Sequence, residues 1–560
     1  YYVAGFLSYE AGLAFEKKIR KETASSIPLL WFGVYRHPII YNHRKRRFEE
    51  GKKRVAGIAP SLARETRTLK AIEVHPKPSV EFAEYQRAVE KIEQYILEGD
   101  TYQVNYTFKL RFLWSGSPAY LFRRLQLSQR VSYSAFVSLR NYKVLSLSPE
   151  LFFRMERGNI ILKPMKGTAP RGRTLEEDRE QMAKLRSSEK DRAENLMIVD
   201  MLRNDVGRVA QTASVKVARY FDIEKYDTLF QATSTIHASL RRNLGVPELV
   251  RSLFHSGSVT GAPKIRTMEI IQELEPETRG IYTGAVGFFA PKKKAVFNVA
   301  IRTVVLDQKR HEGAMGVGGG IVADSETESE YNECLLKGKF LSDSPSEFEL
   351  LETIRWDPGK GYFLMTEHLK RLERSAEYFG FPLDKRVMLA FLRNYEKVLR
   401  KAGKRKHSFR IRLTLGRNGL INAAHFRLDK AKDGQYVSIA ERRTSSSDRF
   451  LFHKTTHRKL YDDELERAML KGYFDVLFLN EHGQLTEGAR SNVILKMGDR
   501  HFTPPISCGL LAGTYRAYLL RSKKYRVEEK VLTPDDLRAA QEVYVCNAVR
   551  GRVKVKVDGL

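Results

Sequence analysis

Two lysines, Lys166 and Lys454, stand in local sequences that suit an amine nucleophile. Lys166 lies in the run Pro164-Met-Lys-Gly-Thr168, and Lys454 lies far downstream in His453-Lys-Thr455. A lysine amine attacks carbon only when it is uncharged, so each site must lower the pKa of its lysine through burial or nearby positive charge. Two such lysines in unrelated surroundings predict two catalytic centres on one chain.

Acidic side chains accompany Lys166 on two predicted helices. A helix opened by Ser188 carries Glu194 on a largely apolar stretch, where a lone charge is costly. A second helix, after a capping-box pattern at Ser325, carries Glu330 and Glu333 on one face. Carboxylates from separate helices suit a hard ion such as Mg²⁺. A Glu-x-x-Glu pair is more often a solvated face, so spacing alone leaves that interpretation open.

Two glycine-rich turns in the same half offer backbone contacts to a ligand. Residues 257–264 lead into a helix, with Pro263 at the expected first helical position, and the N–H groups there favour an anion. Residues 316–320 let the backbone approach a ligand closely. An ordinary capped helix and a tight bend are the structural alternatives. Arg302 carries a guanidinium, which can bind a carboxylate through two hydrogen bonds.

Periodicity predicts the elements that position these groups. Apolar residues recur at helical spacing over residues 80–98, with Ser79 as the expected cap. Residues 102–110 alternate between apolar and polar side chains, which indicates a strand with one buried face. Gln103 lies on the opposite face of this strand.

A polar, proline-containing stretch at residues 342–347 is typical of a linker. It divides the chain into a first domain, residues 1–341, and a second domain, residues 348–560, each large enough for its own core. The chain begins Tyr1-Tyr2 without a methionine, and residues 5–12 resemble the middle of a sheet. We therefore expect the natural start of the first domain to be missing.

The composition excludes several classes of protein. Hydrophobic residues make up 42% of the chain, enough for packed cores, so intrinsic disorder is not expected. No apolar run approaches the roughly 18 residues that span a bilayer, and no signal-peptide pattern opens the chain. The cysteines are odd in number and far apart, which argues against a disulfide framework and for a reducing cytoplasm. They are Cys334, Cys508 and Cys546.

The formal net charge of +30 admits two interpretations. A basic surface can bind nucleic acid, or it can be a solvated surface that steers small anionic substrates. Lysine and arginine are spread along the chain beside abundant glutamate, with no basic tail and no signature of stacking aromatics. We therefore expect neither nucleic acid nor a membrane as a partner.

The motifs of the first half, taken in order, resemble those of the chorismate-utilising enzymes, the family of anthranilate synthase, aminodeoxychorismate synthase and isochorismate synthase. The matching stretches are Gly99-Asp-Thr-Tyr-Gln-Val-Asn105, Ser148-Pro-Glu150, Pro164-Met-Lys-Gly-Thr168, Ala193-Glu-Asn-Leu-Met197, Arg203-Asn-Asp205, residues 257–264, Tyr282-Thr-Gly284 and residues 316–333. The resemblance implies an α/β (α+β) fold, a sandwich of antiparallel sheets flanked by helices.

The resemblance also implies roles for individual residues. Glu194 and Glu333 would bind Mg²⁺, with Glu330 beside them. Lys166 would be the nucleophile, and Glu150 would donate a proton to the departing hydroxyl, a role that needs a carboxyl with a raised pKa. The residues implied to contact chorismate are Thr168, Lys264, Tyr282, Arg302 and the backbone of Gly318 and Gly319.

Two positions select among the members of this family. Anthranilate synthases carry a small residue where Lys166 stands, whereas aminodeoxychorismate synthases carry a lysine nucleophile there. Isochorismate-forming relatives place a lysine base at the position of Gln103. The prediction is amination of chorismate at C4, in which Lys166 adds to C2 and ammonia then enters at C4; an anthranilate synthase-like activity is the less favoured alternative. No glutaminase motif is visible, so ammonia would come from solution or from a separate glutamine amidotransferase subunit.

The motifs of the second half resemble fold-type IV pyridoxal phosphate enzymes, which have a two-lobed fold. The matching stretches are residues 348–355, 367–372 and 409–414, Lys454, and residues 485–493, 509–516 and 546–551. The resemblance implies that Lys454 binds the cofactor aldehyde, that Glu487 keeps the pyridine nitrogen protonated and that Arg371 pairs with the phosphate. The turn that opens a later helix offers N–H groups to the same phosphate; its residues are Leu511, Gly513 and Thr514.

Fold type IV includes branched-chain aminotransferases, D-amino acid aminotransferases and 4-amino-4-deoxychorismate lyase, and local residues do not separate them. The fusion favours the lyase, because this enzyme consumes the product of the first domain and releases pyruvate and 4-aminobenzoate. The sequence thus predicts a cytoplasmic bifunctional enzyme, with a general aminotransferase as the alternative for the second domain. Relatives of this fold type are usually dimers, which leaves a homodimer through the second domain open.

Overall fold

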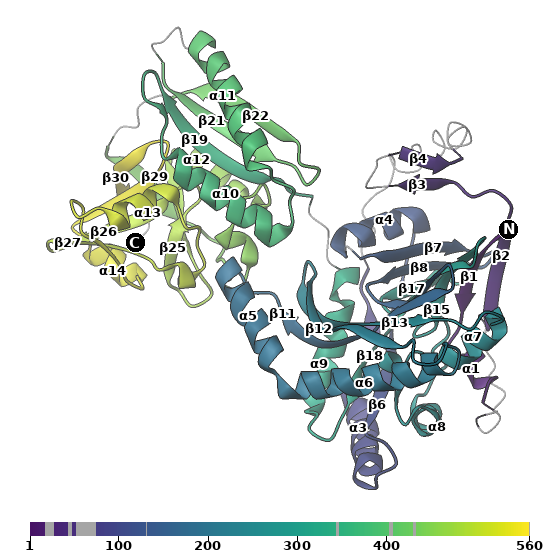
Figure 1. Cartoon of the computed structure of the whole chain (residues 1–560). Helices are drawn as coiled ribbons and strands as arrows, with labels where there is room; N and C mark the ends of the chain where they lie inside the picture. Colours follow the sequence, from purple (N-terminus) through teal and green to yellow (C-terminus); the bar gives the residue numbers. More distant parts are fainter. Residues whose placement is uncertain are drawn as a thin grey trace. The chain divides into compact units, whose positions relative to one another are not determined.

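The computed structural model of the chain describes residues 1–16, 19, 27–42, 47–51, 74–129, 131–342, 347–402, 407–428 and 433–558. The predicted linker, residues 342–347, falls mostly on residues 343–346, which lie outside the described residues, so the predicted domain boundaries stay a prediction. Helices and strands both occur throughout the described chain, with several runs of consecutive strands (Figure 1). The predicted α/β (α+β) class is therefore confirmed.

The packing divides the chain into two compact units. The first unit comprises Tyr1–Pro170 with Met182–Pro345, and the second comprises Arg171–Gln181 with Ser346–Leu560. Residues 171–181 are predicted to lie in the first domain, yet they pack with the second unit. We call these residues the insert segment.

Two antiparallel sheets form the first unit. In the described residues the larger has the strand order β11-β13-β10-β9-β16-β15-β1-β2, with β12 on β13, and the smaller has the order β14-β6-β18-β17-β8-β7, with β5 on β6. The strands of the larger sheet are β1 (Tyr2–Leu7), β2 (Leu30–Tyr35), β9 (Leu151–Glu156), β10 (Asn159–Lys163), β11 (Met165–Pro170), β12 (Lys216–Lys225), β13 (Leu229–Ser239), β15 (Ala285–Ala290) and β16 (Lys294–Val299). Those of the smaller sheet are β5 (Lys77–Pro78), β6 (Gln103–Leu113), β7 (Tyr133–Ser138), β8 (Tyr142–Ser148), β14 (Gly261–Ala262), β17 (Thr303–Asp307) and β18 (Glu312–Ile321), and a separate ribbon pairs β3 (Ile40–Asn42) with β4 (Arg47–Glu50).

Helices flank these sheets, as the family resemblance implies. They are α1 (Glu10–Leu13), α3 (Phe82–Leu97), α4 (Pro118–Ser128), α6 (Glu189–Gly207), α7 (Val246–Leu253), α8 (Lys264–Leu274) and α9 (Thr327–Gly338), with short 3-10 turns η2 (Gly257–Val259) and η3 (Lys339–Leu341). Helix α5 (Leu175–Ser187) begins in the insert segment. Within the described ranges, no helix has both the length and the apolar character needed to cross a membrane.

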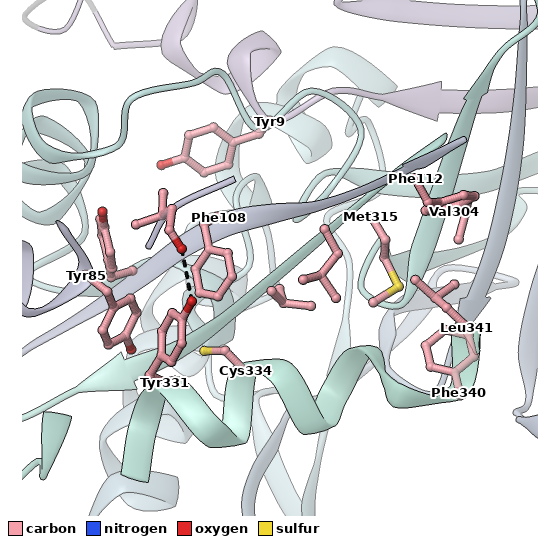
Figure 2. Packing of buried hydrophobic residues seen from close by; sticks show 14 of the residues in the cluster. Tyr9, Tyr85, Phe108, Phe112, Val304, Met315, Tyr331, Cys334, Phe340 and Leu341 are labelled. Atoms are coloured by element: carbon pink, nitrogen blue, oxygen red, sulfur yellow. Dashed lines mark hydrogen bonds between the residues drawn. The ribbon is translucent and has the colours of Figure 1, made fainter. Parts of the chain in front are cut away.

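An aromatic cluster fixes α9 against the smaller sheet (Figure 2). The rings of Tyr85 from α3 and Tyr331 from α9 lie 5.2 Å apart, and Phe108 from β6 stacks on Tyr331 at 5.6 Å. The Tyr331 hydroxyl donates a hydrogen bond to the Val80 carbonyl at 3.1 Å, which satisfies its polar end inside the core. Because Tyr331 follows Glu330 directly, this packing also sets the direction of a predicted site residue.

The predicted helix over residues 80–98 is present as α3, but its predicted cap is wrong. The Ser79 hydroxyl accepts a hydrogen bond from the Lys109 amide at 3.0 Å and so belongs to the contact with β6. Glu81 is the N-cap, in a capping box with Glu84. A long-range contact has taken the serine that local sequence would use as a cap.

Two other helix starts also differ from prediction. Glu326, not Ser325, is the N-cap of α9, because the Ser325 hydroxyl donates to Glu330 Oε1 at 2.9 Å. Pro263 is the N-cap of α8 rather than its first residue. Ser188, by contrast, caps α6 as predicted and accepts from the Asp191 amide at 3.2 Å.

The second unit is built on two further sheets. In the described residues one is antiparallel, in the order β20-β19-β21-β22, and the other is mixed, in the order β25-β24-β23-β30-β29-β26-β27-β28. The strands are β19 (Leu350–Asp357), β20 (Gly361–Tyr362), β21 (Phe409–Leu415), β22 (Ile421–Arg427), β23 (Gln435–Ile439), β24 (Asp475–Leu479), β25 (Leu485–Gly488), β26 (Asn492–Met497), β27 (Arg500–Thr503), β28 (Val527–Glu529), β29 (Glu542–Asn547) and β30 (Gly551–Val557). The helices are α10 (Met365–Phe379), α11 (Lys385–Ala402), α12 (Lys459–Leu470), α13 (Thr514–Arg521) and α14 (Pro534–Ala539), with 3-10 turns η4 (Arg449–Phe452) and η5 (Ile506–Cys508).

Candidate active sites

Lys166 is placed at the meeting point of three elements of the first unit. Its Nζ, on β11, lies 3.3 Å from Glu194 Oε2, on α6. Gln103, on β6, donates through Nε2 to the same oxygen, also at 3.3 Å. The Lys166 amine therefore lies beside a carboxylate and a side-chain amide that come from two other elements.

Two residues without predicted roles hold the backbone of Lys166. The Asn195 side-chain amide donates to the Lys166 carbonyl at 3.0 Å, and the Ser234 hydroxyl donates to Asn195 Oδ1 at 2.6 Å. Both side chains are buried. The sequence offered one signal for a role of Asn195, its position directly after Glu194. Its partner Ser234, on β13, could not be found in this way, because that contact depends on tertiary packing.

The glycine run of β18 forms one wall of this site. A Cβ atom at Gly320 would lie 2.6 Å from Lys166 Nζ and 2.7 Å from Gln103 Nε2. A Cβ atom at Gly319 would lie 2.9 Å from Glu330 Oε2. Glycine at these positions lets the ends of the Lys166, Gln103 and Glu330 side chains lie close to the strand, and a close approach to a ligand stays a prediction. The Gly318 carbonyl accepts from Lys337 Nζ at 2.9 Å.

Glu150, between β8 and β9, is a buried carboxyl near Lys166. Burial raises its pKa to about 7, although a hydrogen bond from Ser258, the Met165 backbone and the Lys166 charge act in the opposite direction. The Ser258 hydroxyl donates to Glu150 Oε1 at 2.6 Å. A carboxyl with a pKa near neutrality can hold and release a proton, as the predicted role requires.

The predicted magnesium ligands present oxygen atoms but no assembled metal centre. Burial raises the pKa of Glu330, and the nearby Glu333 carboxylate adds to this effect. Burial acts to raise the pKa of Glu333 too, but the charge of Lys337, 2.9 Å away, lowers it overall. Within the described ranges no three His, Cys, Asp or Glu side chains are grouped closely enough to hold a metal. Mg²⁺ binding by Glu194, Glu330 and Glu333 stays a prediction.

Arg302 is the residue predicted to bind a substrate carboxylate, and that contact stays a prediction. Its Nη1 donates to Gln129 Oε1, and no carboxylate of the described residues forms an ion pair with it. Burial lowers its pKa to about 10, which marks a guanidinium with an incomplete set of anionic partners. The backbone adopts a left-handed φ of 48°, a conformation that side-chain-bearing residues rarely take.

The other predicted chorismate contacts differ in their surroundings. Lys264 Nζ pairs with Asp205 and donates to the His255 carbonyl at 2.9 Å. The Tyr282 ring is buried against Gly316. The exposed Thr168 hydroxyl donates to Gln231 Oε1 at 3.2 Å. Their contact with a substrate stays a prediction.

Lys454 lines a cavity of about 460 Å³ in the second unit. Burial lowers its pKa to about 7, and the positive charges of Arg458 and Arg371 add to this effect, against the opposite influence of Glu352 and Glu487. About half of the molecules carry this amine in its uncharged form at neutral pH. The site therefore provides the chemical state that a carbonyl-binding lysine needs.

Glu487, on β25, lines the same cavity. Burial raises its pKa to about 7. Its Oε1 accepts from the Tyr461 hydroxyl at 3.1 Å and the Leu511 amide at 3.2 Å, and its Oε2 accepts from the Asn492 amide at 3.2 Å. These donors fix the carboxyl in one orientation, which suits a partner for a ring nitrogen.

Arg371, on α10, is held by a buried glutamate that the sequence did not single out. Glu352, on β19, accepts from Arg371 Nε at 2.9 Å and from its Nη2 at 2.7 Å, and it contacts His368 Nδ1 at 2.7 Å. Burial acts to raise the pKa of Glu352, but the charges of Arg371 and His368 lower it to about 2. The one visible signal in the sequence was a charged residue among apolar neighbours, which does not indicate its partner.

The turn before α13 completes the cavity. Gly513 is the N-cap of α13, and the Asn492 side chain occupies the space that a Cβ atom there would need. Asn492 also donates to the Leu511 carbonyl at 3.0 Å. The Thr514 hydroxyl lies 3.5 Å from His368 Nε2. The free N–H groups of this helix start suit a phosphate, so the predicted cofactor residues do gather around one cavity.

The comparisons with known proteins match each half of the chain to a family. Residues 1–343 match the model of the chorismate binding enzyme family, and residues 349–557 match the amino-transferase class IV model. The chain therefore belongs to the chorismate binding enzyme family, with a class IV aminotransferase domain on the same polypeptide. It is an enzyme chain, and the class IV family implies pyridoxal phosphate as its cofactor.

Individual relatives narrow the class further. The aminodeoxychorismate synthase component 1 of Salmonella typhimurium is 38% identical over 337 residues, which cover 59% of this chain and 73% of that protein. The protein of the same name from Escherichia coli is 42% identical over 250 residues, 45% of this chain and 55% of that protein. The crystal structure of anthranilate synthase component I from Streptococcus pneumoniae has a TM-score of 0.53 at 27% identity and covers 61% of this chain and 80% of that chain.

Proposed function

We propose that the chain makes 4-aminobenzoate from chorismate and ammonia in two steps, one in each unit. The observation that carries this proposal is Lys166, placed among Glu194, Gln103 and Glu150 in a chorismate-binding domain. The second unit then removes pyruvate from 4-amino-4-deoxychorismate. The proposed division into catalytic domains is residues 1–341 and 348–560.

In the first unit, different side chains carry out the separate steps by which ammonia replaces the hydroxyl at C4. Lys166 forms a bond to C2 while the C4 hydroxyl leaves with a proton from Glu150. Ammonia then bonds to C4, and the lysine amine departs from C2. Arg302 orients a substrate carboxylate, and a Mg²⁺ ion held by the three glutamates Glu194, Glu330 and Glu333 would neutralise the other.

The partners follow from the chemistry. Relatives named as component 1 support a separate glutamine amidotransferase subunit as the source of ammonia. The three cysteines are free and buried, which supports the proposed cytoplasmic location. The homodimer stays a prediction.

In the second unit, pyridoxal phosphate would act as an electron sink for the elimination. Lys454 would hold the cofactor aldehyde, and its amine is the group in the cavity that would accept the proton from the substrate C4. Glu487 would pair with the ring nitrogen, while Arg371 and the start of α13 would hold the phosphate. Loss of enolpyruvate from the ring leaves an aromatic product.

Three arginines at the cavity favour the lyase over a branched-chain aminotransferase. Arg410, Arg490 and Arg550 all line the cavity, and no carboxylate of the described residues forms an ion pair with any of them. Burial lowers the pKa of Arg550, and the charges of Arg490 and Arg410 add to this effect. Such a group of cations suits a substrate with two carboxylates, whereas a branched-chain amino acid has one.

The Arg550→Met protein tests this preference. We expect the KM for 4-amino-4-deoxychorismate to rise about tenfold or more, because a charge-assisted hydrogen bond contributes about 1.5–3 kcal/mol. Transamination of leucine or alanine, if any, should change far less. Arg500→Met, at an exposed position paired with Glu528, controls for net charge. An equal effect on both substrates would contradict the dicarboxylate assignment.

Product analysis tests the whole proposal. The purified chain is incubated with chorismate, ammonium, Mg²⁺ and pyridoxal phosphate, and the products are identified by mass spectrometry. We expect 4-aminobenzoate and pyruvate in equal amounts. Anthranilate as the aromatic product would reject C4 amination, and accumulation of 4-amino-4-deoxychorismate would reject the lyase activity.

A further inference from the structure

The insert segment makes an unusual detour in the chain. It follows β11, which carries Lys166, and it leads through α5 to α6, which carries Glu194. Its own residues nevertheless pack within the second unit. Eleven residues of the chorismate-binding sequence thus lie among the side chains of the class IV domain.

The start of the insert segment is anchored in the core of the second unit. Arg171 donates to both oxygens of Asp178, at 2.9 and 2.7 Å, and these side chains are only 5% and 2% exposed. Arg171 Nη2 also donates to the Tyr378 carbonyl at 2.9 Å, and the Tyr378 hydroxyl donates to the Gly172 carbonyl at 2.5 Å. Leu175 is buried in the same apolar cluster as Tyr378. These reciprocal contacts impose one geometry on the segment.

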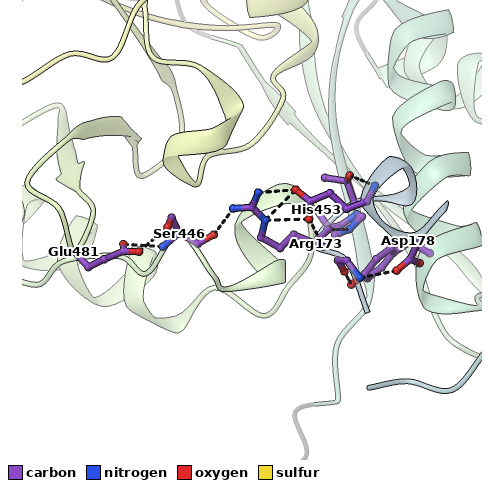
Figure 3. A network of polar contacts seen from close by, with 9 residues as sticks. Arg173, Asp178, Ser446, His453 and Glu481 are labelled. Atoms are coloured by element: carbon purple, nitrogen blue, oxygen red, sulfur yellow. Dashed lines mark hydrogen bonds and ion pairs between the residues drawn. The ribbon is translucent and has the colours of Figure 1, made fainter. Parts of the chain in front are cut away.

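Arg173 connects the insert segment to the residue before Lys454 (Figure 3). Its guanidinium donates to the Ser446 carbonyl at 3.1 Å, and the Ser446 amide donates to Glu481 at 2.8 Å. Its backbone carbonyl accepts a hydrogen bond from His453 Nε2 at 3.1 Å. The segment thus reaches the immediate neighbour of the catalytic lysine.

The contacts of His453 define its tautomer. A carbonyl can only accept, so Nε2 carries a proton. Burial lowers the pKa of His453 to about 3, so the ring is neutral and Nδ1 is unprotonated. Nδ1 therefore accepts from the Ser375 hydroxyl at 3.0 Å. The ring also stacks on Tyr378, with centroids 4.3 Å apart.

We propose that the insert segment positions Lys454, through the hydrogen bond from His453 to the Arg173 carbonyl. The backbone at His453 is extended, with φ −125° and ψ 134°, so the side chains of His453 and Lys454 point to opposite sides. Fixing the imidazole therefore fixes the peptide from which Lys454 reaches into the cavity. The Lys454 carbonyl is held on its other side by the Leu351 amide at 2.9 Å. This inference rests on the proposed role of Lys454.

A pair of substitutions at His453 tests the proposal. His453→Phe keeps a ring but removes the donor to Arg173, whereas His453→Gln can keep a donor near the position of Nε2. We expect His453→Phe to weaken pyridoxal phosphate binding about tenfold, because the Arg173 carbonyl loses its donor and the Ser375 hydroxyl loses its acceptor. We expect a similar loss in the rate at which formaldehyde and cyanoborohydride methylate Lys454 of the cofactor-free protein, measured by peptide mass spectrometry. His453→Gln should restore both values to within about threefold of the parent.

Two further variants and one measurement make the result decisive. Glu176→Gln removes an exposed contact of the same segment, with Arg374, and should leave both values unchanged. Ser375→Ala removes only the partner of His453 Nδ1 and should give a smaller change in the same direction. If thermal melting shows that His453→Phe is unfolded, Ser375→Ala decides whether the position of the His453 ring affects Lys454. Unchanged methylation and cofactor binding in folded His453→Phe would overturn the positioning role. Borohydride reduction of the parent protein tests the role of Lys454 separately from the positioning role. A cofactor found on Lys454 upholds the proposed function even if the positioning role is overturned. A cofactor found on another residue rejects both the proposed role of Lys454 and the positioning role.

Discussion

The Lys454→Ala protein is expected to convert chorismate into 4-amino-4-deoxychorismate and to release no measurable 4-aminobenzoate. The side chain supplies both the covalent attachment of the cofactor and the base at the substrate C4, so we expect the second step to fall by at least about a thousandfold. The visible absorption of the bound cofactor should disappear as well. Product analysis and absorption spectroscopy on the same sample check both expectations.

The state of this amine gives the prediction a pH signature. Because its surroundings lower the pKa of Lys454 to about 7, the uncharged form predominates above that pH rather than above the ordinary lysine value of 10.5. Cofactor capture by the cofactor-free parent should therefore rise with pH, with a midpoint near 7, and then level off. Lys385→Ala, at a largely exposed lysine paired with Glu373, is the matched control. Full 4-aminobenzoate release by Lys454→Ala would remove the assignment.

The second large effect is expected from Lys166→Ala. This protein should fail to aminate chorismate, with a loss of at least about a thousandfold, because the covalent route to C4 is removed. Its second unit should still release 4-aminobenzoate from added 4-amino-4-deoxychorismate at the parent rate. Chorismate consumption and product masses, measured with ammonium as the nitrogen source, report the two steps separately.

A neighbouring lysine provides the control for this substitution. Lys163, at the end of β10, pairs with Glu224 and not with the residues around Glu194. Lys163→Ala should therefore keep amination near the parent rate. Parent-like amination by Lys166→Ala would show that ammonia reaches C4 without a lysine adduct.

Local pattern was sufficient for the elements that carry the predicted catalytic groups. The alternation around Gln103 predicted β6, and the serine before the Glu194 helix predicted its cap. Motif order then brought Lys166 and Glu194 to the same place, and the structure puts them 3.3 Å apart. These features depend on residues near one another in sequence or on the motif order that carries the family resemblance.

Features that depend on distant partners were out of reach. Ser79 and Ser325 have good capping sequences, but each hydroxyl bonds elsewhere because tertiary contacts compete with local ones. Glu352 as the anchor of Arg371 follows only from the packing of β19 on α10. The insert segment is the clearest case. Nothing in the composition of residues 171–181 indicates that they pack in the second unit rather than in the first.

Because the insert segment packs in the second unit, a fragment that starts at the predicted linker would lack part of that unit. A fragment beginning at residue 346 would lack Leu175, which helps fill the apolar cluster around Tyr378, and would leave the His453 ring without the carbonyl that accepts from it. This fragment would expose apolar surface and leave a buried polar group without a hydrogen-bond partner next to Lys454. Recombination of this class IV half with other proteins would therefore have to bring along a short piece of the chorismate half or replace it.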